Sequence, residues 1–157
     1  IGTQDIIEKI GFGQVYDFEE KLLNPNFQQL VKDNLIGIAT IGMASCGGQL
    51  QTENDRGKAR AVKLAKWVSR AVSRISNLNI YELNLGKHRK SGVECRKLSD
   101  ETRDSQRRIL LIGITKNSDP GVNIRDALQR AMKSIAVSQP KKLPINPSEY
   151  HLFSFIH

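Results

Sequence analysis

Apolar residues change their spacing several times along the chain, and each spacing predicts a different element. Leu35 to Ile41 is mostly apolar and rich in β-branched residues, which is typical of a strand buried on both faces. Asn79 to Leu85 alternates apolar with polar positions, and Arg108 to Thr115 is another apolar run. Leu152 to Ile156 predicts a last strand. We expect these segments to form a central sheet.

Helical spacing separates the predicted strands. Residues 55–75 form the strongest predicted helix, because apolar side chains recur there every three or four positions. A shorter helix is expected after Asn24, a suitable N-cap that precedes Pro25, and another over Val122 to Val137. Lys87 to Gln106 is polar and charged without periodicity, so it is predicted to be a long loop.

The alternation of strands and helices predicts the fold class α/β, as an α+β two-layer sandwich. Weaker patterns near the N-terminus predict a helix within residues 1–13 and a strand at 14–18. The length of 157 residues suits one domain with one sizeable core. Because the chain begins at Ile1 rather than at Met, we expect a fragment of a larger protein.

Composition narrows the classes of function. The chain has 24 Lys and Arg against 16 Asp and Glu, a net charge of +8 that favours polyanionic partners. No apolar run approaches the roughly 20 residues that span a bilayer. Cys46 and Cys95 lack the spacing of a zinc site, and the sequence leaves open whether they form a disulfide. No phosphate-binding motif is present either, so no cofactor and no metal are predicted.

The strongest candidate site follows the first buried strand. Gly42 to Gly48 consists of small residues and Met43, and it joins that strand to the long helix. In open α/β sheets, ligands bind at such carboxyl ends of strands. Arg60 lies fifteen residues beyond Ser45, on the helix that the loop enters. We therefore expect Ser45 and Arg60 to face one another.

These residues resemble the OmpA-like C-terminal domain, the peptidoglycan-associated module of OmpA, Pal and MotB proteins. The family's Gly-His-Thr-Asp loop is matched by Gly42 to Ser45, and its following glycine by Gly48. Its Leu-Ser-x-x-Arg-Ala helix start is matched by Arg56 to Ala61, and its Asn-Arg-Arg-Val by Gln106 to Ile109. The resemblance covers roughly residues 27–115.

The resemblance implies a single OmpA-like domain over residues 1–157, with a β-α-β-α-β core at about 14–116. Residues 117–157 would add a C-terminal helix and strand. It also implies a non-catalytic binding or assembly module of the bacterial cell envelope, cut from a membrane-anchored protein and located in the periplasm. The implied pocket is rimmed by Gly42, Ser45, Cys46, Arg60 and Arg107.

The chain departs from the family at the centre of this pocket. In the family, the loop Asp and the helix Arg together hold the diaminopimelate of the peptidoglycan stem peptide. Here Arg60 is kept, but the Asp position is Ser45, which offers a hydroxyl and no charge. We expect a degenerate pocket that binds a peptidoglycan fragment, another anionic ligand or a partner protein through Arg60.

Two other functions are compatible with the sequence. The long helix carries basic residues and an aromatic, a pattern that suits nucleic acid or another polyanion and a cytoplasmic location. The residues of this alternative are Lys63, Trp67, Arg70 and Arg74. The second alternative is a cysteine hydrolase with Cys46 as its nucleophile, and it would need a histidine such as His88 nearby.

Overall fold

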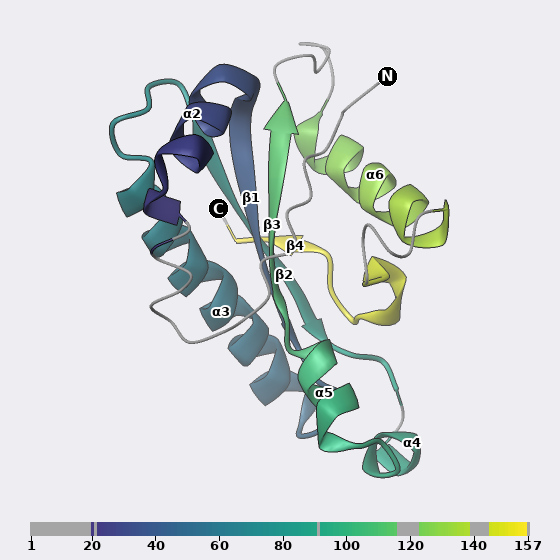
Figure 1. The fold of residues 1–157 in the computed structure, drawn as a ribbon. Coiled ribbons are helices and arrows are strands. Elements are labelled where there is room, and N and C mark those ends of the chain that lie inside the picture. Colours follow the sequence, from purple (N-terminus) through teal and green to yellow (C-terminus); the bar gives the residue numbers. More distant parts are fainter. Residues whose placement is uncertain (1–19, 21, 91, 116–122, 139–144, 157) are drawn as a thin grey trace.

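The computed structural model describes residues 20, 22–90, 92–115, 123–138 and 145–156. The predicted helix within 1–13 and strand at 14–18 lie outside these residues. Figure 1 shows the described elements arranged around one sheet. In chain order they are α2 (Pro25–Asn34), β1 (Leu35–Ala44), α3 (Leu50–Ala71), β2 (Asn79–Lys87), α4 (Gly92–Arg96), α5 (Asp100–Gln106), β3 (Ile109–Thr115), α6 (Ile124–Ser138), the 3-10 turn η1 (Pro147–Glu149) and β4 (Ser154–Phe155).

The sheet has four described strands in the order β3-β1-β2-β4. β1 and β2 are parallel and are joined by α3, whereas β3 pairs antiparallel with β1, and β4 antiparallel with β2. The register between β1 and β2 shifts after Gly42, which creates an irregularity one residue before Met43. Nine of the ten residues of β1 are buried, as its nearly continuous apolar run predicts for a central strand.

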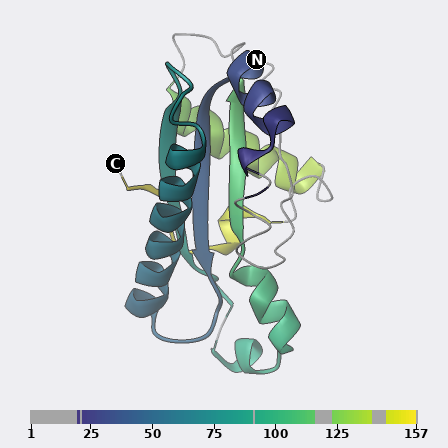
Figure 2. The ribbon, with the colours of Figure 1, turned by 60° about the vertical axis from the view of Figure 1, so that its left-hand side comes forward.

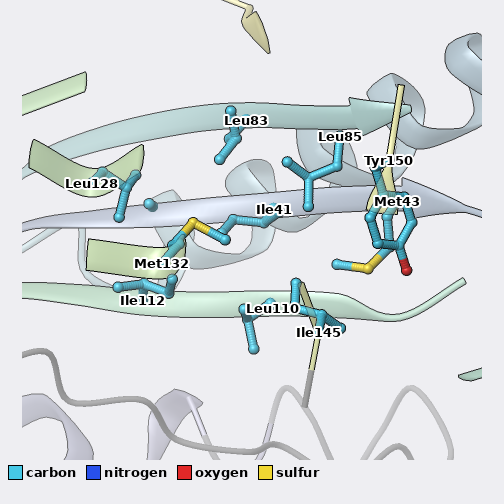
Figure 3. Close-up of a cluster of buried hydrophobic side chains, with 11 residues drawn as sticks. Ile41, Met43, Leu83, Leu85, Leu110, Ile112, Leu128, Met132, Ile145 and Tyr150 are labelled. Atoms are coloured by element: carbon cyan, nitrogen blue, oxygen red, sulfur yellow. The ribbon is translucent and has the colours of Figure 1, made fainter. Parts of the chain in front are cut away.

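Helices cover both faces of this sheet (Figures 1 and 2). Successive β1 side chains alternate between the faces, so Ile38 packs with Leu64 and Val68 of α3, while Ile41 packs on the opposite side. Figure 3 shows the apolar cluster on the Ile41 side of the sheet, to which α6 contributes Leu128 and Met132. Its buried members are Ala39, Ile41, Met43, Leu83, Leu85, Leu110, Ile112, Leu128, Met132, Ile145 and Tyr150. The predicted α/β class is therefore confirmed.

α3 packs against β1 and β2 so closely that there is no room for a side chain at two contact positions, Gly42 and Gly57. A Cβ on Gly42 would lie 2.0 Å from the Gly57 carbonyl oxygen and 2.5 Å from the Ala61 nitrogen. A Cβ on Gly57 would lie 2.5 Å from Asn84 Oδ1. Glycine at both positions therefore lets the first half of α3 lie directly on β1 and β2.

Several predicted boundaries are wrong, for local reasons. The helix predicted at 55–75 begins at Leu50 and ends at Ala71. Its start was missed because the first turn is polar, and its end is set by Val72, which leaves the helical conformation and caps the last turn. The predicted loop Lys87 to Gln106 contains the helices α4 and α5, and Ser99 caps α5 by accepting a hydrogen bond from the Thr102 amide. The last strand, predicted at 152–156, is reduced to two residues.

The structure has the helix and the strand that were predicted in the C-terminal part of the chain. α6 begins at Ile124 and ends at Ser138, close to the predicted Val122 to Val137, of which Val122 lies outside the described residues. β4 pairs with β2 through Leu83 and Asn84. The C-terminal segment therefore extends the sheet beyond β2.

Candidate functional site

The candidate site lies where β1 ends and the chain turns toward α3. Ser45 and Cys46 follow the strand directly and are buried, with Ser45 only 2% exposed. The Ala44 carbonyl oxygen accepts a hydrogen bond from the His88 amide over 3.0 Å, which holds the end of β1 beside the end of β2. The turn after β1 is therefore a fixed part of the sheet edge.

Two arginines from different elements reach this turn. Arg60 of α3 is partly buried, and its Nη1 donates to the Met43 carbonyl oxygen over 2.7 Å. Arg107, the residue after α5, donates from Nε to Ser45 Oγ over 3.2 Å and from Nη1 to Asp104 Oδ1 over 3.1 Å. The Arg107 side chain is 46% exposed. The end of β1 thus binds one guanidinium through the Met43 carbonyl oxygen, and the turn that follows binds the other through the Ser45 hydroxyl.

The charges around Arg60 are mostly positive. Burial lowers the pKa of the Arg60 guanidinium, the Glu53 carboxylate raises it, and the charges of Arg107 and Arg56 lower it further. Arg60 nevertheless stays protonated, because the ordinary pKa of arginine lies far above neutral pH. The positive charge of Arg107 thus disfavours the charged form of Arg60, and an anion bound by both guanidinium groups would offset that effect.

Glu53 is a buried carboxylate beneath the turn. Its side chain is 3% exposed and forms an ion pair with Arg56, one helical turn along α3. Gly48 has a φ of +75°, and a Cβ there would lie 2.5 Å from Glu53 Oε1. The glycine therefore serves both the left-handed backbone and the close contact with the carboxylate. Sequence reasoning missed Glu53, although it lies four residues before Gly57 and eight before Ala61, on the buried side of the helix.

A disulfide joins the turn to the segment between β2 and β3. Cys46 and Cys95 are bonded, their Cα atoms are 5.7 Å apart, and 49 residues separate them. The same segment supplies Gln106, whose Oε1 accepts a hydrogen bond from the Cys46 amide over 3.0 Å. The Gln106 carbonyl oxygen accepts another from the Tyr150 hydroxyl over 3.1 Å. These contacts hold α5, and with it Arg107, against the end of β1.

Comparison of the chain with protein-family models, with curated proteins and with solved structures yields no match. The OmpA-like resemblance therefore stays a prediction. Among the described residues, His, Cys, Asp and Glu form no group that could hold a metal ion. Within that same part of the chain, no helix combines the length and the apolar character that crossing a bilayer requires.

The structure brings most of the predicted pocket residues together. Arg107 donates to Ser45 Oγ, whereas Arg60 donates to the Met43 carbonyl oxygen, so among the described residues no hydrogen bond joins Arg60 to Ser45, the residue that it was expected to face. Gly42 lies beneath α3, where its lack of a side chain serves packing. Cys46 was expected to rim the pocket and, in one alternative, to act as a nucleophile. Its sulfur is instead buried and bonded to Cys95, so this form has no Cys46 thiolate for either role.

The residues of the polyanion alternative lie mainly on the outer side of α3. Lys63 and Arg70 are exposed, and Trp67 is partly buried between them against the apolar cluster beneath α3. The Lys63 ammonium lies 5.2 Å from the centroid of the Trp67 ring. Arg74 follows the end of the helix at Ala71, so it does not continue the helical row.

A second ionisable cluster lies at the end of β2. His88 forms a bridge with Tyr150, and their rings meet edge to face with centroids 5.1 Å apart. Burial lowers the pKa of His88, while the Glu149 carboxylate, 3.7 Å from its Nε2, raises it. Burial also raises the pKa of the Tyr150 hydroxyl. This cluster connects β2 to the C-terminal segment.

Proposed function

We propose that the chain is a non-catalytic binding module of the cell envelope, and that the turn after β1 binds the carboxylate of a cell-wall peptide. One observation carries the proposal. Arg60 and Arg107 arrive from different elements at the end of β1, where they donate hydrogen bonds to the Met43 carbonyl oxygen and to Ser45 Oγ, two residues apart in the chain. Two converging guanidinium groups form a binding site for an anion.

The arginines are anchored and still have donors to offer. A guanidinium carries five N–H donors in a planar fork that matches a carboxylate. Within the described residues, Arg60 donates through one nitrogen to Met43, and Arg107 donates through two nitrogens, to Ser45 and Asp104. The anchoring bonds fix the orientation of both groups, and their partial burial strengthens an interaction with a ligand.

The charges favour a carboxylate over a zwitterion. Ser45 stands where the family resemblance would place an acid, and its hydroxyl carries no charge. The buried acid of the site, Glu53, already pairs with Arg56 and is covered by the backbone of Gly48. A ligand ammonium therefore gains little, and recognition rests on the carboxylate end of the peptide.

The disulfide supports a location in the envelope. Disulfides form and persist in the periplasm and outside the cell, whereas cytosolic thiols are kept reduced. Cys46 and Cys95 are both buried, and their bond joins the turn that carries Ser45 to the segment before Arg107. A site that depends on this bond is suited to an oxidising compartment.

The first experiment uses insoluble peptidoglycan that contains diaminopimelate, in a pull-down. We expect the wild type to bind and Arg60→Ala to lose binding. Arg130→Ala is the control, because it removes the same charge from an exposed position on α6, on the other face of the sheet. If Arg60→Ala and Arg130→Ala bind equally, the assigned pocket is wrong.

The second experiment tests what the site recognises. A soluble stem tripeptide that ends in diaminopimelate is compared by calorimetry with the same peptide acetylated at its free side-chain amine. The wild type should bind both with similar affinity, since the carboxylates described at the site, Glu53 and Asp104, already pair with Arg56 and Arg107. Ser45→Asp should prefer the unacetylated peptide. A wild-type preference for the free amine would contradict carboxylate-only recognition.

A further inference from the structure

The outer side of α3 carries a row of cations that the proposed pocket does not use. We define the basic face as Lys63, Lys66 and Arg70, with Arg56 at its amino end. These four residues are exposed, and their spacing of seven, three and four positions places them on one side of the helix. Figures 1 and 2 show α3 at the outside of the molecule, with its opposite side on the sheet.

Beyond Arg56, which pairs with Glu53, α3 has no acidic residue to balance Lys63, Lys66 and Arg70. The two acids of α3 lie in its first two turns, where Glu53 is buried against Arg56 and Asp55 accepts a hydrogen bond from Gln51 over 3.0 Å. From Arg56 to Leu78 the sequence contains seven Lys and Arg residues and no Asp or Glu. The basic face therefore has a high local positive charge, which attracts an extended anionic partner.

Trp67 argues against nucleic acid as that partner. Single-stranded nucleic acids bind such surfaces by stacking their bases on exposed aromatic rings. The Trp67 ring is partly buried against the apolar cluster beneath α3, and the Lys63 ammonium lies 5.2 Å from its centroid. The buried disulfide also favours a compartment in which lipid headgroups, rather than nucleic acids, are the prevalent polyanions.

We propose that the basic face docks the domain on a membrane surface of anionic phospholipid. A helix of 22 residues is about 33 Å long, so its cations lie along one line that fits a flat array of phosphates. Each cation near such a surface contributes about 1 kcal/mol, or about a fivefold gain in partitioning. Since Lys63, Lys66 and Arg70 make no hydrogen bond to the turn after β1 among the described residues, this surface acts independently of the pocket.

The test is co-sedimentation of the whole chain with vesicles at low salt. We expect binding to phosphatidylcholine vesicles that contain phosphatidylglycerol, and none to phosphatidylcholine alone. The double variant Lys66→Gln with Arg70→Gln should lower the partition coefficient about 25-fold, because each residue contributes about fivefold. The matched control is Arg130→Gln with Lys133→Gln, two exposed cations on α6 across the sheet, which should bind like the wild type.

Three results would overturn the proposal. Equal binding to neutral and anionic vesicles would exclude an electrostatic docking surface. If the α3 and α6 double variants lose vesicle binding equally, the binding depends on net charge and not on the basic face. Binding to single-stranded DNA without binding to anionic vesicles, at the same ionic strength, would assign the basic face to nucleic acid.

Discussion

Removal of the Cys46–Cys95 disulfide should lower both stability and ligand binding. The bond closes a loop of 49 residues, and the chain-entropy relation for such a loop gives about 4 kcal/mol at 25 °C. An entropy of unfolding of about 2.1 cal/mol/K per residue amounts to about 330 cal/mol/K for this length, so the melting temperature should fall by about 12 °C. Binding should weaken as well, because the bond holds the segment that carries Gln106 and Arg107 against the turn.

The assay is thermal unfolding followed by circular dichroism, with and without a thiol reductant. The double variant Cys46→Ala with Cys95→Ala should melt near the reduced wild type and should not respond to reductant. The variant separates loss of the bond from any other effect of the reagent. Two thiols that react quantitatively in the untreated native protein, or a melting temperature that reduction leaves unchanged, would refute the reasoning.

Two further predictions concern packing and pH. Gly42→Ala should lower the free energy of unfolding measured in urea by about 3 kcal/mol or more, because the new Cβ would lie 2.0 Å from the Gly57 carbonyl oxygen. Gly92→Ala is the control, because a Cβ at position 92 would have no atom within 4 Å. Burial lowers the pKa of His88 in the folded state below its ordinary value of 6.5. Neutral His88 therefore contributes to the free energy of unfolding above pH 6.5, and this contribution is lost as the pH falls through the lower folded-state pKa. In urea titrations at several pH values, His88→Gln should weaken the pH dependence of the free energy of unfolding, whereas His151→Gln, at an exposed position, should leave it unchanged. If His88→Gln also leaves the pH dependence unchanged, His88 is not its source.

Much of the fold was predictable because burial leaves a periodic trace in the sequence. β1 was recognised from its nearly continuous apolar run, and α3 from apolar positions that recur at the period of a helix. α4 and α5 were missed because their buried members, Cys95 and Gln106, are not part of an apolar stripe. A disulfide and hydrogen bonds anchor these short helices, and neither leaves a hydrophobic period.

The candidate site was predictable only in part, for a related reason. The small residues after β1 indicated a strand-end turn, and the family resemblance related Ser45 to Arg60. The position of Glu53 was overlooked because a charged residue is seldom expected in a core, and only its pairing with Arg56 makes its burial tolerable. The role given to Cys46 was misjudged because the sequence could not establish its partner.

By itself, the sequence determined where the chain forms strands and long helices, and it determined the excess of positive charge. Both follow from residues that are near one another along the chain. The tertiary structure decided that Cys46 bonds to Cys95, that Glu53 is buried beneath Gly48, and that Arg60 and Arg107 donate hydrogen bonds to Met43 and Ser45 at the end of β1. The disulfide joins positions 49 residues apart and the Arg107–Ser45 contact spans 62, so only the folded sheet brings these groups together.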